Sequence, residues 1–178
     1  NDVFLIDNSG AIVHSWAGSN LPGLSVYLTP DYDLIRTNRI APGPLPSGNG
    51  GGLQRLDWSG NVVWDYQYYS AGQHLQHHDI EWLPNGNILA VAWEWKTNQD
   101  AINAGRNPAY LSTTTNLFLP DHIVELQPVG TGGANIVWEW HIWDHLVQDF
   151  NPALPNFGVV ANHPERVNVN FPPFPPFN

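Results

Sequence analysis

The chain has 178 residues, and its 6 lysines and arginines against 16 aspartates and glutamates give a formal net charge of −10. This charge excludes a basic surface for nucleic-acid phosphates or for an anionic membrane. No apolar stretch reaches the roughly 18 residues of a membrane-spanning helix. The length predicts a single domain over residues 1–178. Because the chain has no cysteine, disulfides and thiolate nucleophiles are excluded as well.

Nine tryptophans, 16 glycines and 16 prolines give an aromatic composition that is rich in turns. Such aromatic content is atypical of disordered chains, and glycine and proline disfavour long helices. No methionine is present, even at position 1. We therefore expect a chain that begins after processing or is part of something longer.

A strand–turn–strand pattern occurs twice early in the chain. Residues 5–16 read LIDNSGAIVHSW and residues 55–66 read RLDWSGNVVWDY, so that the D-x-S-G turn and the apolar pair after it align at an offset of 50. Glycine at the fourth turn position can adopt the positive φ that a tight hairpin needs. Each copy therefore predicts a β-hairpin.

A second hairpin is predicted after each copy. Residues 28–37 read LTPDYDLIRT and residues 82–91 read WLPNGNILAV, with the prolines aligned at an offset of 54. Proline followed by Asn-Gly is a strong turn signal between two strands. A third copy of the first hairpin, HIVELQPVGTGGANIVWEWHIW, begins at residue 122 and has a longer glycine-rich turn.

These hairpins predict an all-β fold of four-stranded antiparallel blades of the β-propeller type. The units repeat at a period of about 50 residues and span residues 3–40, 53–95 and 122–145, the last without its second hairpin. Propellers typically have 4–8 blades, whereas this chain holds about two and a half. We therefore expect a fragment of a larger propeller, or repeats that other chains complete.

Three segments break the repeat. The glycine- and proline-rich residues 41–52 predict a flexible loop. Within the insert over residues 97–120, TNQDAINAGR predicts a short helix capped by Thr97 or Asn98. Residues 146–178 predict an irregular proline-rich tail, and its closing segment, FPPFPPFN, favours polyproline II.

The densest group of chemically active side chains is His74-Leu75-Gln76-His77-His78-Asp79. Imidazoles here could bind an anion, act as general acid or base, or serve as nucleophiles, with Asp79 orienting a neighbouring ring. A hydrogen-bonded polar cluster at a strand end is the alternative. His74 and His77 could also chelate a metal with Asp79 or His122. Their spacing matches no familiar zinc motif, so we expect no metal and no cofactor.

The segment WEWHIWDH at residues 138–145 forms a second cluster. Its alternation, like that of Trp-Glu-Trp at residues 93–95, indicates strand packing. The functional alternative makes His141 and His145 substrate-binding residues. Arg36 is a third candidate, because arginine is scarce in this chain and suits an anionic substrate. A surface salt bridge is the alternative for Arg36.

Four segments, GLSVYLTPDYDLIRT, QHHDIEWLPNGNILAVAWE, PDHIVELQP and IVWEWHIWDHLVQDF, resemble the N-terminal half of the arylsulfotransferase-like β-propeller family. The likeness extends over most of residues 3–170. It implies a six-bladed propeller that is extracytoplasmic, whether periplasmic, secreted or at the cell surface. It also implies that sulfuryl groups move between phenols through a channel histidine, without a nucleotide cofactor.

The resemblance further implies roles for individual residues. The family's histidine in the H-H-D motif matches His77 or His78; we prefer His78 as the catalytic residue, with His77 and Asp79 in support. The family's next motif, D-W-L-H-x-N-S, and the histidine that carries the sulfate would follow residue 178. A small phenolic or sulfated substrate would therefore meet only part of the family's site in this chain.

Two further functions fit the same residues. A non-catalytic extracellular module would complete its blades with other copies of the chain, since open blade edges invite strand addition. A carbohydrate-binding propeller would stack sugars on tryptophan faces that lie beside carboxylates. Neither alternative involves nucleic acid or a membrane span.

Overall fold

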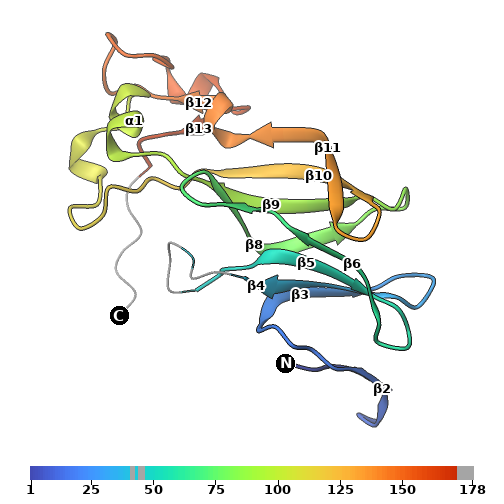
Figure 1. Cartoon of the computed structure of the whole chain (residues 1–178). Helices are drawn as coiled ribbons and strands as arrows, with labels where there is room; N and C mark the ends of the chain where they lie inside the picture. The colour runs from blue at the N-terminus through green and yellow to red at the C-terminus, as the bar shows by residue number, and fades with distance from the viewer. Residues whose placement is uncertain (41–42, 44–46, 172–178) are drawn as a thin grey trace. The chain divides into compact units, whose positions relative to one another are not determined.

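The computed structural model describes residues 1–40, 43 and 47–171 of the chain (Figure 1). These residues fall into two compact units. Unit 1 comprises Asn1–Trp93 and Ile123–Glu139. Unit 2 comprises Glu94–His122 and the described residues from Trp140 onward.

Unit 1 begins with a hairpin, which is followed by an antiparallel sheet whose strands lie side by side in chain order (Figure 1). The hairpin strands are β1 (Val3–Ile6) and β2 (Ile12–Trp16). The sheet strands are β3 (Pro22–Leu28), β4 (Leu34–Arg39), β5 (Gly51–Leu56) and β6 (Val62–Gln67). Because β4 pairs with β5, the second hairpin of one sequence repeat and the first hairpin of the next form a single sheet.

A second sheet continues the same up-and-down order from β7 to β11. Its strands are β7 (Tyr69–Ser70), β8 (His74–Trp82), β9 (Ile88–Glu94), β10 (Asp121–Val129) and β11 (Gly133–His141). The long insert predicted over residues 97–120 leaves the sheet after β9 and returns at β10. This insert supplies much of unit 2.

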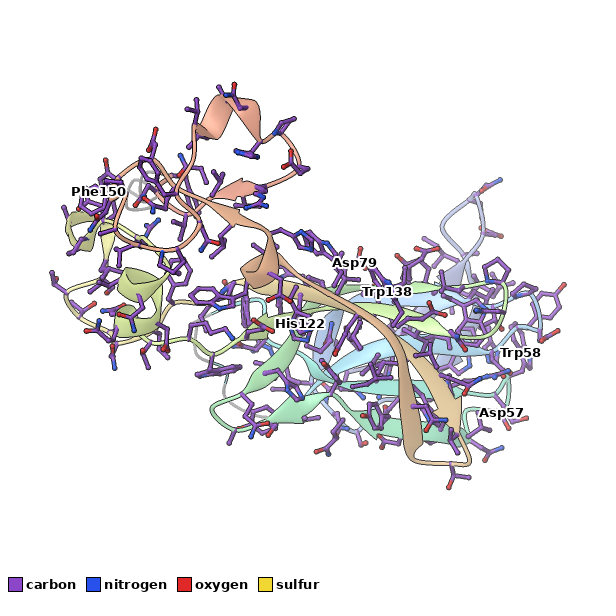
Figure 2. All side chains as sticks on the ribbon, turned by 90° about the horizontal axis from the view of Figure 1, so that it is seen from above. Asp57, Trp58, Asp79, His122, Trp138 and Phe150 are labelled. Atoms are coloured by element: carbon purple, nitrogen blue, oxygen red, sulfur yellow. The ribbon has the colours of Figure 1, made fainter. Side chains whose placement is uncertain are left out.

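The D-x-S-G segments form the hairpin turns that the sequence predicts. The amide of Gly10 donates to the carbonyl of Asp7, and that of Gly60 to the carbonyl of Asp57, each at 3.0 Å. The two glycines adopt φ of 86° and 85°. The Asp57 carboxyl lies at the end of its hairpin (Figure 2). Its pKa is lowered mainly by a hydrogen bond from the Asn61 side chain, and also by one from the Asn61 backbone amide. These turns are fixed by contacts within a few residues.

The chain just before and at the start of β5 lies against β8. The amide of His78 donates to the carbonyl of Gly48 at 3.0 Å, and the amide of Gly51 donates to the buried Gln76 Oε1 at 3.0 Å. A Cβ on Gly50 would lie 2.2 Å from the same Gln76 oxygen. A run of glycines is therefore needed for the backbone to come this close to β8.

The prediction of a flexible loop over residues 41–52 is wrong for the C-terminal end of this segment. Residues 51–52 belong to β5, and residues 48–50 are buried against β8. The glycines there allow tight packing. From the sequence they are interpreted as a sign of flexibility alone. Residues 41–42 and 44–46 lie outside the described residues.

The main apolar core of unit 1 takes side chains from both sheets. Ile35 and Leu53 come from the first sheet, whereas Ile88 and Leu126 come from the second, and all four are fully buried. Trp64 and Ile80 belong to the same cluster. Burial of apolar side chains of this size is the main stabilising contribution to such a unit.

Unit 2 contains helix α1 (Asn98–Asn103), which confirms the short helix predicted in the insert. Its N-cap is Thr97, whose hydroxyl accepts a hydrogen bond from the Asp100 amide at 3.0 Å. The Asp100 carboxylate in turn accepts from the Thr97 amide at 2.7 Å. This reciprocal capping box satisfies two amides that the helix leaves unbonded at its start.

The described remainder of unit 2 is mostly irregular and is held by a buried arginine. Arg106 donates to the carbonyls of Val169, Phe171 and Tyr110. The short elements are η1 (Pro108–Tyr110), η2 (Ile142–His145), η3 (Val160–Asn162), and the parallel strands β12 (Leu146–Val147) and β13 (Val167–Asn168). Residues 172–178, on which the polyproline II prediction falls, lie outside the described residues.

The prediction of an all-β fold with antiparallel sheets is confirmed. The number of propeller blades is not confirmed and stays a prediction. Within the part of the chain that the structure describes, no helix has the length and apolar character that crossing a membrane would require.

We predict that Leu53→Ala lowers the free energy of unfolding of unit 1 by about 2–5 kcal/mol, because it leaves a cavity in a core that holds two sheets together. The matched control is Val62→Ala, which shortens an apolar side chain that is 51% exposed on the next strand. This control should change the free energy by about 0.5 kcal/mol or less. Urea unfolding followed by tryptophan fluorescence measures both, and equal effects would contradict the packing described here.

Candidate functional site

Strand β8 places two neighbouring imidazoles in contact in unit 1. Successive side chains of a regular strand point to opposite faces of the sheet. His78 departs from this rule because its backbone adopts φ of 52°, in the left-handed region. The kink brings Nδ1 of His77 and Nδ1 of His78 to 2.8 Å from each other. Strain of this kind, about 1–3 kcal/mol, is often retained at functional sites.

The two rings differ in their surroundings. His77 is 6% exposed, and its ring stacks on buried Trp93 with 4.1 Å between ring centroids and 14° between planes. The His78 ring is exposed and packs against Gly48, where a Cβ would come within 2.3 Å of Cε1. His77 is therefore held in place, whereas His78 presents its outer edge to solvent.

The contact between the two Nδ1 atoms restricts protonation. A hydrogen bond between two ring nitrogens contains one proton, which one ring donates and the other accepts. If His78 donates, its Nε2 has a free lone pair and can attack an electrophile. If His77 donates, Nε2 of a neutral His78 carries the hydrogen instead. The direction of this hydrogen bond thus sets whether Nε2 of a neutral His78 has a lone pair or carries a hydrogen.

Two side chains of β3 donate hydrogen bonds to the Asp79 carboxylate. Its Oδ1 accepts hydrogen bonds from the Ser25 hydroxyl at 2.6 Å, from the Tyr27 hydroxyl at 3.4 Å, and from the Ile80 amide at 2.9 Å. Burial, and then the negative charge of Asp79, raises the pKa of Tyr27. Asp79 therefore links β8 to β3 beside the histidine pair.

Arg36 lies inside the first sheet. Its guanidinium donates twice to Gln54 Oε1, at 3.2 and 2.8 Å, and Gln54 donates to the Asp65 carboxylate at 2.9 Å. Burial lowers the pKa of Arg36, against the opposing effect of Asp65. Arg36 is thus part of a polar network across β4, β5 and β6.

Unit 2 brings together Glu94, His122 and His141, which offer one metal-ligand atom each, all within 4.8 Å of one another. The two rings stack with centroids 4.9 Å apart and planes 7° apart. His141 Nδ1 contacts Glu94 Oε1, and Lys96 Nζ lies 3.4 Å from Glu94 Oε2. His122, labelled in Figure 2, is buried.

The sequence patterns do not predict this trio. Glu94 ends β9, His122 lies near the start of β10 and His141 ends β11, so antiparallel order puts them at one end of three adjacent strands. Their separations along the chain, 28 and 19 residues, match no metal motif. The signal that could have found the trio is the predicted strand order. Trp-Glu-Trp at residues 93–95 and WEWH at residues 138–141 both lie where a strand ends, so their polar side chains could be expected near each other.

The other sequence candidates lie elsewhere in their units. The His145 ring stacks on Trp140 in unit 2, with centroids 4.8 Å apart. In unit 1 the His74 ring stacks on Tyr68 with centroids 4.4 Å apart.

A cavity of about 810 Å³ lies at the far end of β8 from the histidine pair, about 16 Å along the strand. Residues around it include Asp31, Arg55, Trp82, Asn85 and Gln127.

Comparison with known proteins gives one partial likeness. The chain is 32% identical over 85 residues to a sphingolipid delta(4)-desaturase of Schizosaccharomyces pombe; the match covers 46% of this chain and 22% of that protein. No family and no solved structure matches the chain. The chain thus spans about a fifth of the relative it matches, which is too little to assign a family.

The expected membership of the arylsulfotransferase-like family is wrong. No family match supports it, and the curated protein that was found is a desaturase. Segments such as LPNGN and IVWEW carried much of the resemblance. Turn chemistry explains LPNGN, and strand alternation explains IVWEW, which lies in β11, so both occur in unrelated β proteins.

We predict that His78→Asn leaves the free energy of unfolding unchanged or raises it by up to about 1 kcal/mol, because the short polar side chain of asparagine can form local hydrogen bonds in the left-handed region. The same substitution one residue earlier, His77→Asn, should lower it by about 1–3 kcal/mol, because it removes a buried ring stacked on Trp93. Thermal and urea unfolding measure the pair. A loss at His78 as large as that at His77 would contradict the strain argument.

Proposed function

We propose that unit 1 carries a histidine-dependent group-transfer site that moves a sulfuryl group from an aryl sulfate to an acceptor phenol. The observation that carries the proposal is the contact of 2.8 Å between Nδ1 of His77 and Nδ1 of an exposed His78 at positive φ. His78 is the catalytic residue, and His77 is a positioning residue that accepts its proton.

The chemistry follows from the protonation state in which His78 donates to His77. Nε2 of His78 attacks sulfur, an N–S bond forms, and the S–O bond to the phenol breaks with its electron pair leaving on phenolate. As the His78 ring becomes positively charged, its Nδ1 proton passes to Nδ1 of His77. An acceptor phenol then gives its proton to the released phenolate and attacks sulfur. The N–S bond breaks with its electron pair returning to Nε2 of His78, and His77 gives the Nδ1 proton back to His78.

Charge and leaving group favour an aryl sulfate. A sulfate monoester carries one negative charge, whereas a phosphate monoester carries up to two at neutral pH. The chain has 6 lysines and arginines against 16 acidic residues, so the singly charged ester is the easier one to bind. A phenol, with a pKa near 10, also leaves without a general acid more readily than an alcohol.

We predict that the chain releases phenol from a chromogenic aryl sulfate when a second phenol is present, and that His78→Asn reduces this rate at least about 100-fold. His77→Asn should lower the rate less and shift its pH profile, because the proton acceptor is lost. His163→Asn, at an exposed ring in unit 2, is the matched control and should leave the rate unchanged.

Turnover that persists in His78→Asn would contradict the proposal, as would an absence of turnover in the wild-type chain. Equal rates with aryl phosphate would contradict the choice of the sulfuryl group.

A second candidate function is assembly through exposed sheet edges, with β3–β6 and the following strands acting as propeller-type blades. On β3 the outward side chains are apolar, and Leu24 is 63% exposed, with Val26 and Leu28 exposed beside it. On the edge strand β11, Ile136 and Trp138 are also exposed. We propose that a second copy of the chain covers β3, outside the cytoplasm, a location with which the absence of cysteine is compatible.

We predict that the chain elutes as a species larger than its 19.9 kDa monomer, and that Val26→Lys shifts it to the monomer, since a charge would be buried in the contact. Val159→Lys changes a valine outside the sheets that is 61% exposed, against 48% for Val26, and should leave the mass unchanged. Light scattering after gel filtration measures both. A monomeric wild-type chain would contradict assembly by β3.

A further inference from the structure

We propose that Glu94, His122 and His141 of unit 2 bind one divalent first-row transition-metal ion of the zinc class. This inference goes beyond the group-transfer proposal, since it concerns other residues in the other unit. It rests on the three ligand atoms within 4.8 Å of one another, on their chemistry and on their burial.

The strands preposition the three ligands. His122 is 2% exposed, and the Glu94 and His141 side chains are 13% and 24% exposed, so little water must be displaced to bring an ion in. Ligand atoms of a tetrahedral zinc site lie roughly 3.3 Å apart, given metal–ligand bonds of about 2.0–2.1 Å. Side-chain rotations complete that arrangement by bringing the more distant atoms closer and by moving His141 Nδ1 and Glu94 Oε1 apart.

Without an ion, two of the proposed ligand atoms are hydrogen-bonded to each other. The contact between His141 Nδ1 and Glu94 Oε1 requires a hydrogen between a ring nitrogen and a carboxylate oxygen. Both of these atoms are metal ligands once that proton is released. Metal binding at this pair, which is already in contact, thus requires the hydrogen to leave Nδ1, either to Nε2 of the same ring or to water.

The ligand set selects the class of ion. Two imidazoles and one carboxylate suit Zn²⁺ and neighbouring first-row ions, whereas Ca²⁺ and Mg²⁺ prefer oxygen ligands throughout. Three protein ligands also leave a coordination position for water or for a substrate atom. The site is therefore an open one, unlike a closed structural zinc site with four protein ligands.

A substitution at Lys96 distinguishes a metal site from an ion-pair network. Its Nζ lies 3.4 Å from Glu94 Oε2 and also contacts the Trp143 ring, with 5.1 Å to the ring centroid. A positive charge beside a ligand carboxylate opposes a divalent ion. Lys96→Met removes that charge and keeps an unbranched apolar stem, so it should strengthen metal binding.

The experiment is a titration of the chelator-treated full chain with Zn²⁺, and with Co²⁺ as a coloured probe. We expect one ion per chain and a visible Co²⁺ spectrum with nitrogen and oxygen ligands. Glu94→Gln and His141→Asn should each weaken binding at least about tenfold, and Lys96→Met should tighten it several-fold. Mg²⁺ should not compete.

The matched control is His163→Asn. His163 also contacts a glutamate, Glu165, at 3.1 Å, but this exposed pair is not part of the trio. Its replacement should leave zinc affinity unchanged. The proposal is overturned if no stoichiometric binding occurs, if Glu94→Gln binds as tightly as the wild-type chain, or if His163→Asn weakens binding as much as Glu94→Gln does. Circular dichroism of each variant establishes that a loss of binding is not a loss of folding.

Discussion

The close approach of the glycine-rich backbone at residues 48–52 to β8 is the constraint on which unit 1 depends. The buried Gln76 amide accepts from Gly51 and donates to the carbonyl of His77, so one side chain fixes both strands where the two sheets meet. The hydrogen bond from His78 to the Gly48 carbonyl holds the kink in place. Without that approach, the neighbouring imidazoles would alternate across the strand, and the contact between their Nδ1 atoms would be lost.

Local chemistry explains which elements could be predicted from the sequence. The D-x-S-G hairpins and the Thr97 capping box depend on contacts over four residues or fewer, and both are found where they were expected. The packed end of the segment 41–52 was not predicted, because the side chains that Gly48 and Gly50 pack against, those of His78 and Gln76, lie more than twenty residues away. Composition alone cannot distinguish glycines that pack closely from glycines that bend freely.

The candidate sites also differ in whether contacts between neighbouring residues or contacts between distant strands form them. His77 and His78 are adjacent in sequence, so the pair was visible, but the positive φ that lets the rings meet was not. Glu94, His122 and His141 come from three strands, and only the strand order brings them together. Arg36 was chosen for its scarcity, although its partner Gln54 sits opposite it on the next strand. Prediction of such groups requires the pairing register, which hydrophobic pattern and turn length determine only approximately.

The pairing of β4 with β5 has a consequence for how the chain tolerates breakage. Six residue pairs join these strands, from Leu34 with Leu56 to Arg39 with Gly51, although the strands belong to different sequence repeats. A nick in the connection between them would therefore not separate one repeat from the next. The two fragments would stay associated through the ladder and the shared core, and they would come apart only in denaturant. A sheet that is assembled across its own repeats in this way favours complementation between separately expressed pieces.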